Sequence, residues 1–95
     1  MLTLSTTSLT GTTVRNRTGE DLGDIKDFML DVDNGRVLYA VLDFGGFLGI
    51  GDKYFAVPLE ALRPDTQSEQ LVLDVDKAAL GNAPGFDKNN WPVTP

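Results

Sequence analysis

The clearest structural signal in this chain is the stretch LDVDNGRVLYAVLDF, residues 30–44. Its centre, Asn34-Gly35, lies between two apolar runs, and both residues tolerate positive φ. Tight primed turns need positive φ at their central positions, so this dipeptide is a strong hairpin signal. We therefore expect an antiparallel β-hairpin closed by a tight turn at Asn34-Gly35.

The strand that follows this turn, Arg36 to Phe44, is apolar on both faces. One parity carries Val37, Tyr39 and Val41, and the other carries Leu38, Ala40, Leu42 and Phe44. A small barrel has only one interior, so the second face needs a separate cover. We expect a homodimer to provide it, with the helix and tail after residue 76 as the alternative cover.

The segments before the hairpin also form short strands. In Leu22 to Val32 the apolar alternation slips once, between Ile25 and Phe28, and a bulge near Lys26-Asp27 would restore it. Further upstream, the β-branched segment Thr12 to Asn16 precedes a turn at residues 17–20, in which Gly19 can take positive φ.

The segments after the hairpin continue this pattern. A glycine-rich loop, residues 45–52, leads into the aromatic strand Lys53 to Val57, which Pro58 ends. Residues 59–62 form one helical turn, residues 63–65 form another turn, and Glu69 to Val75 is the last strand. Short strands at this tight spacing predict an all-β fold, a small β-barrel.

Ninety-five residues make one domain, because so short a chain cannot divide its apolar residues between two cores. We expect a lead-in at residues 1–7, the barrel at residues 8–76, and a short helix with an irregular tail at residues 77–95. Asp76 can cap a helix over residues 77–80, which Gly81 closes. Phe86 and Trp91 should dock the tail through their rings.

The composition of the chain argues against several classes of partner and of catalytic or metal site. The chain has a net charge of -6, which disfavours nucleic acid and anionic membrane surfaces as partners. It has no His and no Cys, which excludes the usual zinc sites, thiolate nucleophiles and Ser-His triads. The N-terminus lacks a secretory signal, and the longest purely apolar run, Val37 to Leu42, is too short for a membrane span. We expect a cytoplasmic protein that needs no cofactor and no metal.

Two motifs resemble known ligand-binding loops but lack residues that those loops require. Residues 46–53 resemble a phosphate-binding loop, but Asp52 stands where the lysine is required. Residues 31–42 resemble a calcium loop, but Arg36 replaces the required glycine and Leu42 replaces the bidentate glutamate. Both stretches are therefore interpreted as structural.

Carboxylates are the remaining candidates for chemistry. Asp43 lies in an otherwise apolar strand, and we expect it to pair across strands with Lys53. The alternative is a small-ligand or metal-binding pocket, closed by the glycine-rich loop and lined by Asp43 or Asp27.

Large apolar side chains in the glycine-rich loop are candidates for an interface. Phe47, Leu48 and Ile50 either fold back over the barrel mouth or form a contact with another protein. The full set of candidate interface residues is Tyr39, Phe47, Leu48, Ile50, Phe86 and Trp91.

The order of these elements resembles a known family. The relevant motifs are G-x-x-V at residues 11–14, LGDI at 22–25, LDVDNGRV at 30–37, GGFLGIGDK at 45–53 and VP at 57–58. Together they resemble the PRC-barrel family, over roughly Ser8 to Asp76, and the tail at residues 82–92 is similar to that of stand-alone bacterial members.

The resemblance implies a small, strongly bent antiparallel β-barrel that binds other macromolecules and carries no family catalytic residues. We expect neither the transmembrane helix of the photosynthetic reaction-centre H subunit nor the N-terminal domain of the ribosome-maturation factor in this protein, so neither role is carried over from the resemblance. We expect a non-enzymatic, self-associating protein-interaction module. The alternatives are the small-ligand or metal-binding protein and a ribosome or RNA-processing accessory factor.

Overall fold

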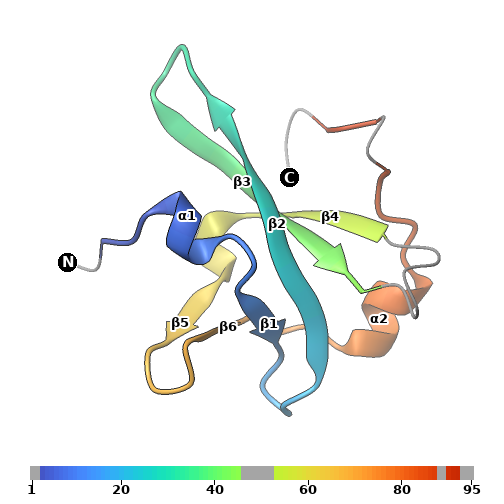
Figure 1. Ribbon diagram of the computed structural model, residues 1–95. Coiled ribbons are helices and arrows are strands. Elements are labelled where there is room, and N and C mark those ends of the chain that lie inside the picture. The colour runs from blue at the N-terminus through green and yellow to red at the C-terminus, as the bar shows by residue number, and fades with distance from the viewer. Residues whose placement is uncertain (1–2, 46–52, 88–89, 93–95) are drawn as a thin grey trace.

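A computed structural model describes residues 3–45, 53–87 and 90–92 of the chain. Within them, six strands hydrogen-bond into one sheet in the order β4-β3-β2-β1-β6-β5 (Figure 1). The elements are α1 (Thr6–Leu9), β1 (Thr13–Arg15), β2 (Asp21–Asp31), β3 (Arg36–Phe44), β4 (Lys53–Val57), the 3-10 turn η2 (Leu59–Ala61), β5 (Arg63–Asp65), β6 (Gln70–Val72) and α2 (Lys77–Asn82). The predicted all-β fold is confirmed. The sheet is strongly bent but does not close, because β4 and β5 lie at its two ends.

Strand direction is antiparallel throughout the described sheet except at one pair. β1 and β6 run parallel, with Val14 opposite Leu71. This pairing brings the last strand back beside the first, so that segments far apart in the chain share one core. The core residues are Val14, Leu22, Ile25, Ala40, Leu42, Val57, Leu62, Leu71 and Leu73.

The β2–β3 hairpin is the largest unit of the sheet, and it projects from the rest of the molecule (Figure 1). Its register shifts between Ile25 and Asp27, which confirms the predicted bulge. A second shift, between Met29 and Leu30, was not predicted from the sequence. Each bulge bends its strand and increases the local twist, so the 11-residue β2 can curve around the core and still extend past it.

The hairpin turn differs from the expected tight turn. It spans residues 32–35, and Asp31 and Arg36 form the last strand pair before it. Gly35 has a φ of 66°, as the glycine was expected to have, but Asn34 does not have positive φ. Instead, the Asn34 backbone N–H and side-chain amide donate to the Asp31 carboxylate, at 3.2 and 2.7 Å. These hydrogen bonds stabilise a longer turn, so the predicted two-residue primed turn is wrong.

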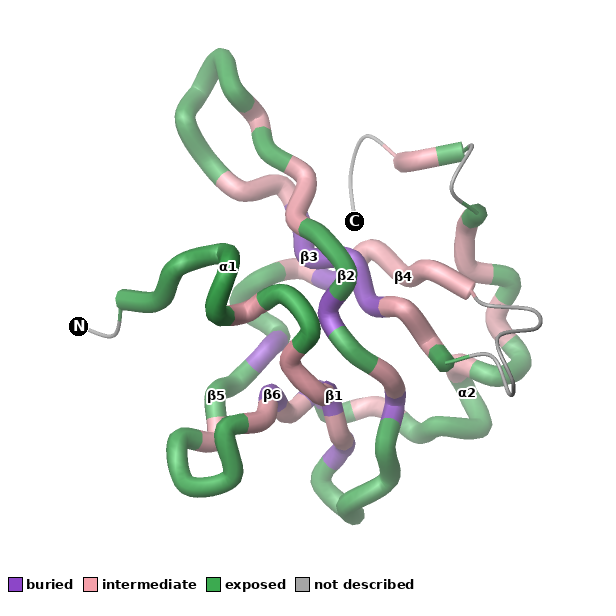
Figure 2. Tube along the Cα trace, viewed as in Figure 1, coloured by how far each residue is buried: buried purple, intermediate pink, exposed green. Residues whose placement is uncertain are grey.

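Both faces of β3 are buried. Tyr39, Ala40, Val41 and Leu42 each have 0% of their surface exposed (Figure 2). Ala40 and Leu42 belong to the core on one face. On the other face, the Tyr39 hydroxyl donates a 2.6 Å hydrogen bond to the Pro92 carbonyl. At Tyr39, therefore, the tail of the same chain supplies the cover for which the sequence first suggested a second copy.

The region after β4 departs most from expectation. Residues 63–65 were predicted as a turn but form β5, and β6 is shorter than the predicted strand Glu69 to Val75. β5 is an edge strand, where Pro64 is tolerated because no further strand needs its missing N–H. The helical turn after Pro58 is confirmed as η2.

The two α-helices also differ in detail from the sequence interpretation. α1 begins at Thr6, within the expected lead-in at residues 1–7, and ends at Leu9; the sequence did not predict it. α2 begins after Asp76 as expected, but the Asp76 side chain makes no capping hydrogen bond, and the helix runs through Gly81 to Asn82. At the C-terminal end of α2, the Lys53 ammonium donates hydrogen bonds to the carbonyls of Gly81 and Ala83, at 2.6 and 2.9 Å.

Candidate functional site

A groove of about 390 Å³ lies between α1 and the β5–β6 hairpin. Leu9 and Leu71 form its floor, and Leu71 belongs to the buried core. Leu4 and Pro64 add apolar walls, and Leu4 remains 49% exposed. This volume is within the range of small binding sites, so the groove is large enough to accept a few side chains.

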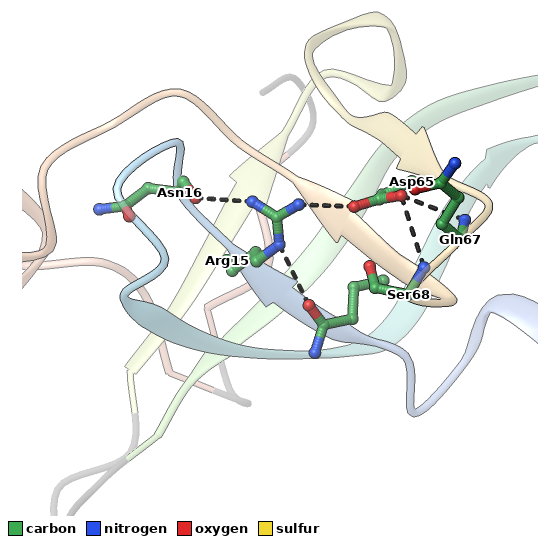
Figure 3. Close-up of polar contacts among 6 residues, drawn as sticks. Arg15, Asn16, Asp65, Gln67 and Ser68 are labelled. Atoms are coloured by element: carbon green, nitrogen blue, oxygen red, sulfur yellow. Dashed lines mark hydrogen bonds and ion pairs between the residues drawn. The ribbon is translucent and has the colours of Figure 1, made fainter.

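One wall of the groove is held by an arginine network. The Arg15 guanidinium donates to Asp65 Oδ2 at 2.6 Å, to Gln70 Oε1 at 3.1 Å and to the Asn16 carbonyl at 3.1 Å (Figure 3). Arg15 thus connects β1 to both strands of the β5–β6 hairpin. Hydrogen bonds from the Ser68 side chain and from Arg15 lower the pKa of Asp65 below its ordinary value of 3.8, against the opposing effect of desolvation. Asp65 is therefore ionised at neutral pH.

Asn16 is the buried polar residue beside this network, with 3% of its surface exposed. Its side-chain amide donates to Glu20 Oε1 and to the Val75 carbonyl, at 2.7 and 3.1 Å. Its side-chain oxygen accepts from the backbone N–H groups of Thr18 and Glu20 and from the Thr18 hydroxyl. These contacts shape the predicted turn at residues 17–20 and tie it to the chain after β6, so Asn16 is structural.

The opposite wall of the groove is α1, a helix of only four residues. The Ser5 hydroxyl accepts from the Ser8 backbone N–H, and the Gly11 N–H donates to the Ile25 carbonyl at 2.7 Å. The second bond connects the end of the helix to β2. Local capping, this tie to the sheet and the packing of the partly buried Leu9 against the core hold α1 in place.

A second candidate surface is the hairpin tip, residues 30–37. Leu30 and Val32 are 53% and 84% exposed there, and they line a shallow depression with Val37 and Arg36. Arg36 pairs with Asp31 at 3.4 Å, and Figure 2 shows the end of the hairpin as mainly exposed. Hydrogen bonds from Asn34, with a smaller effect of Arg36, lower the pKa of Asp31.

The aromatic residues of the tail pack together on β4. Phe86 forms an isolated bridge with Tyr54, with N···O distances of 3.0 and 2.8 Å. The rings of Tyr54, Phe86 and Trp91 lie 5.4–6.2 Å apart between centroids. The predicted docking of the tail through Phe86 and Trp91 is confirmed. Burial raises the pKa of Tyr39, whose hydroxyl donates to this tail.

The six predicted interface residues do not form one surface among the residues that the structure describes. Tyr39 is buried, and Phe86 and Trp91 are partly buried against Tyr54. The remaining three, Phe47, Leu48 and Ile50, lie outside the described residues.

The predicted cross-strand pairing of Asp43 with Lys53 is wrong. The register of β3 and β4 places Asp43 opposite Tyr54, and the Lys53 ammonium binds the end of α2 instead. Asp43 also lies opposite Asp24 on β2, whereas Asp27 lies opposite Val41 and is exposed.

A small depression of about 290 Å³ lies near the glycine-rich loop, beside Gly23 and Gly45. Its carboxylates come from Asp21 and Asp24 rather than from Asp27, and Lys77 lies beside them. The Asp21 carboxylate accepts a 2.8 Å hydrogen bond from the Gly23 N–H. Within residues 3–45, 53–87 and 90–92, no group of three or more His, Cys, Asp or Glu side chains is arranged to hold a metal ion.

Sequence reasoning missed the groove and its arginine network. Arg15 and its partners Asp65 and Gln70 are at least 50 positions apart in the chain. The parallel β1–β6 pairing brings them together, and no local pattern signals that pairing.

The bent sheet around one apolar core, with a short helix and a docked tail, defines a small β-barrel-type module. The described residues contain no helix long and apolar enough to cross a bilayer. The chain belongs to the PRC-barrel domain family, because the family model for that domain matches residues 1–80 of the 95. No curated protein matches the sequence.

Proposed function

We propose that the chain is a non-enzymatic protein-interaction module that self-associates through the hairpin tip. The observation that carries this proposal is the exposure of Leu30 and Val32 at the end of a projecting hairpin. Exposed apolar groups gathered at one place on a small domain are typical of contact surfaces.

The distribution of charge at the tip favours a second copy as the partner. A two-fold contact places one patch against itself, so the patch must be self-complementary. The tip carries Asp33 and Arg36, both exposed and of opposite charge, beside the apolar pair. Two copies can therefore bury Leu30 and Val32 together while Arg36 of one copy approaches Asp33 of the other.

The test is analytical ultracentrifugation of the wild type and of the double variant Leu30→Ser/Val32→Ser. At about 100 μM we expect the wild type to sediment with twice the 10.3 kDa chain mass, and the double variant as a monomer. The control is Leu59→Ser, because Leu59 is also exposed, at 39%, but lies on η2. A monomeric wild type, or a double variant that still dimerises, would contradict the proposal.

Ligand binding at the depression near Gly23 is the second candidate, and a specific feature favours it. Asp21, Asp24 and Lys77 bring both signs of charge to one small hollow. A thermal-shift screen with divalent metals and small metabolites tests it, since a ligand that binds the folded state raises the melting temperature. A shift that is abolished by Asp24→Asn would favour this candidate over the first.

A further inference from the structure

The groove between α1 and the β5–β6 hairpin is pre-organised. Arg15 holds the hairpin wall through Asp65 and Gln70. The bond from Gly11 to Ile25 holds the end of α1. A site whose walls are already ordered loses less conformational entropy when an occupant binds, so this groove can bind a short segment.

The apolar surface of the groove is incompletely covered. Leu71 is buried in the floor, but Leu4 on the wall keeps 49% of its surface exposed. Pro64 has no N–H at this edge of the sheet, which limits the addition of another strand. An occupant is therefore held through its side chains more than through its backbone.

The charged residues that line the groove are both acidic, Asp65 and Glu69. Arg15 pairs with Asp65, whereas no ion pair of Glu69 is present among the described residues. The whole chain also carries a net charge of -6, which favours a basic peptide over an acidic one at this groove. Charge complementarity thus selects a cationic occupant.

Glu69 adds a further reason, because its backbone is unfavourable for its residue type. Its φ is 57°, and it is the non-glycine residue with positive φ within the described part of the chain. Glycine would adopt this conformation without the steric cost of a side chain. The conformation of the β5–β6 turn therefore gives no local reason for a glutamate at this position.

We propose that this groove binds a short basic segment of another protein. One or two apolar side chains of the segment enter between Leu4 and Leu71, and a lysine or arginine pairs with Glu69. The inference rests on the proposed role as a protein-interaction module, but it uses a different surface from the hairpin tip.

The probe is a terminally blocked synthetic nonapeptide, Ala-Lys-Lys-Leu-Ala-Leu-Lys-Lys-Ala, titrated into the full chain and followed by amide chemical shifts. We expect shift changes concentrated at residues 4–12 and 63–71. Glu69→Gln should weaken binding about 2- to 5-fold, in the range of a solvent-exposed ion pair. The matched control Glu60→Gln, an exposed glutamate on η2, should leave the affinity unchanged.

Glu69→Gly separates binding from folding. Because glycine relieves the positive-φ strain, this variant should unfold at a higher denaturant concentration than the wild type while binding the peptide more weakly. Weaker binding that accompanies lower stability would indicate a structural role for Glu69 and overturn the proposal.

Two other peptides define the remaining outcomes. Equal binding of a peptide with glutamates in place of the lysines would overturn the charge argument. Tighter binding of a peptide spanning residues 28–38 would identify the occupant as the hairpin of a second copy and overturn it as well. Because the groove and the hairpin tip are different surfaces, Glu69→Gln should weaken peptide binding and leave the sedimentation of the chain unchanged. Failure of this proposal is therefore distinguishable from failure of the proposed self-association.

Discussion

At the scale of single residues, two glycines with positive φ are expected to respond very differently to substitution. Gly23 has a φ of 127°, and a Cβ there would lie 2.0 Å from the Asp43 carbonyl oxygen. Gly35 has a φ of 66°, but a Cβ there would meet no atom within 4 Å. Gly35→Ala should therefore cost only the backbone strain, about 1–2 kcal/mol.

Gly23→Ala adds a clash with the backbone of β3 to that strain, so it should cost more than about 3 kcal/mol. Urea denaturation of the two variants measures the difference. Similar midpoints for both would show that β2 and β3 move apart easily at Gly23, contrary to the close approach described here.

The Asp65 carboxylate makes stability depend on pH. Its pKa is lower in the folded chain than its ordinary value of 3.8, so the folded state binds protons less readily than the unfolded state. The stabilisation is present above pH 4 and is lost as the pH falls through the lowered folded-state pKa. We expect urea midpoints to decrease below about pH 4, and to decrease less in Asp65→Asn.

Glu60→Gln is the control for this experiment, because Glu60 is an exposed carboxylate on η2, outside both the Arg15 network and the hairpin tip. It should leave the pH dependence of the wild type unchanged. An Asp65→Asn variant with the full wild-type pH dependence would assign the effect to other carboxylates, such as Asp31, whose pKa is also lowered.

At the scale of the elements, the tail is the segment whose packing is easiest to follow. Trp91 is the single tryptophan, and its ring lies 5.4 Å from that of Phe86. Its emission should be blue-shifted in the folded chain and move to the red on unfolding. Phe86→Ala should move the folded-state emission to the red and cost about 1–3 kcal/mol, because half-buried aromatic contacts are lost.

Phe28→Ala is the matched control for the tail. Phe28 packs against the core rather than the tail, so this variant should lose stability without a change in folded-state emission. Unchanged Trp91 emission in Phe86→Ala would contradict the aromatic packing of the tail.

The sequence predicted those elements that local patterns determine and missed those that depend on distant contacts. The β2–β3 hairpin, the bulge after Ile25 and the turn at Gly19 were predicted because alternation and turn residues are local signals. α1 was missed because it has four residues, of which Leu9 alone packs against the core, and it depends on bonds such as that between Gly11 and Ile25.

The candidate site could not be predicted in the same way. The groove needs α1, the edge strand β5 and the parallel β1–β6 pair together, and each of these depends on long-range pairing. The docking of Phe86 and Trp91 was predicted because large aromatic rings favour burial in any context, whereas the partner of Asp43 required the strand register.

At the scale of the whole molecule, the open sheet has two ends, and each is protected differently. β5 is three residues long and contains Pro64, and β4 is covered at Tyr54 by the bridge to Phe86. Short strands, proline and covering segments are the usual protection of sheet edges against further pairing. Bulges also discourage further strand pairing, and the two bulges of β2 give this protection to the projecting hairpin.

The bridge between Tyr54 and Phe86 also sets an order of events during protein synthesis. The ribosome releases the chain from its amino end, so β4 emerges before the tail that covers it. The edge of β4 stays open until Phe86 has also left the ribosome and docked. Neighbouring nascent chains on one messenger RNA could pair through β4 during this interval. Pairing of Phe86 with Tyr54 ends the interval, and we expect the tail to protect each new molecule in this way from its neighbours on the polysome.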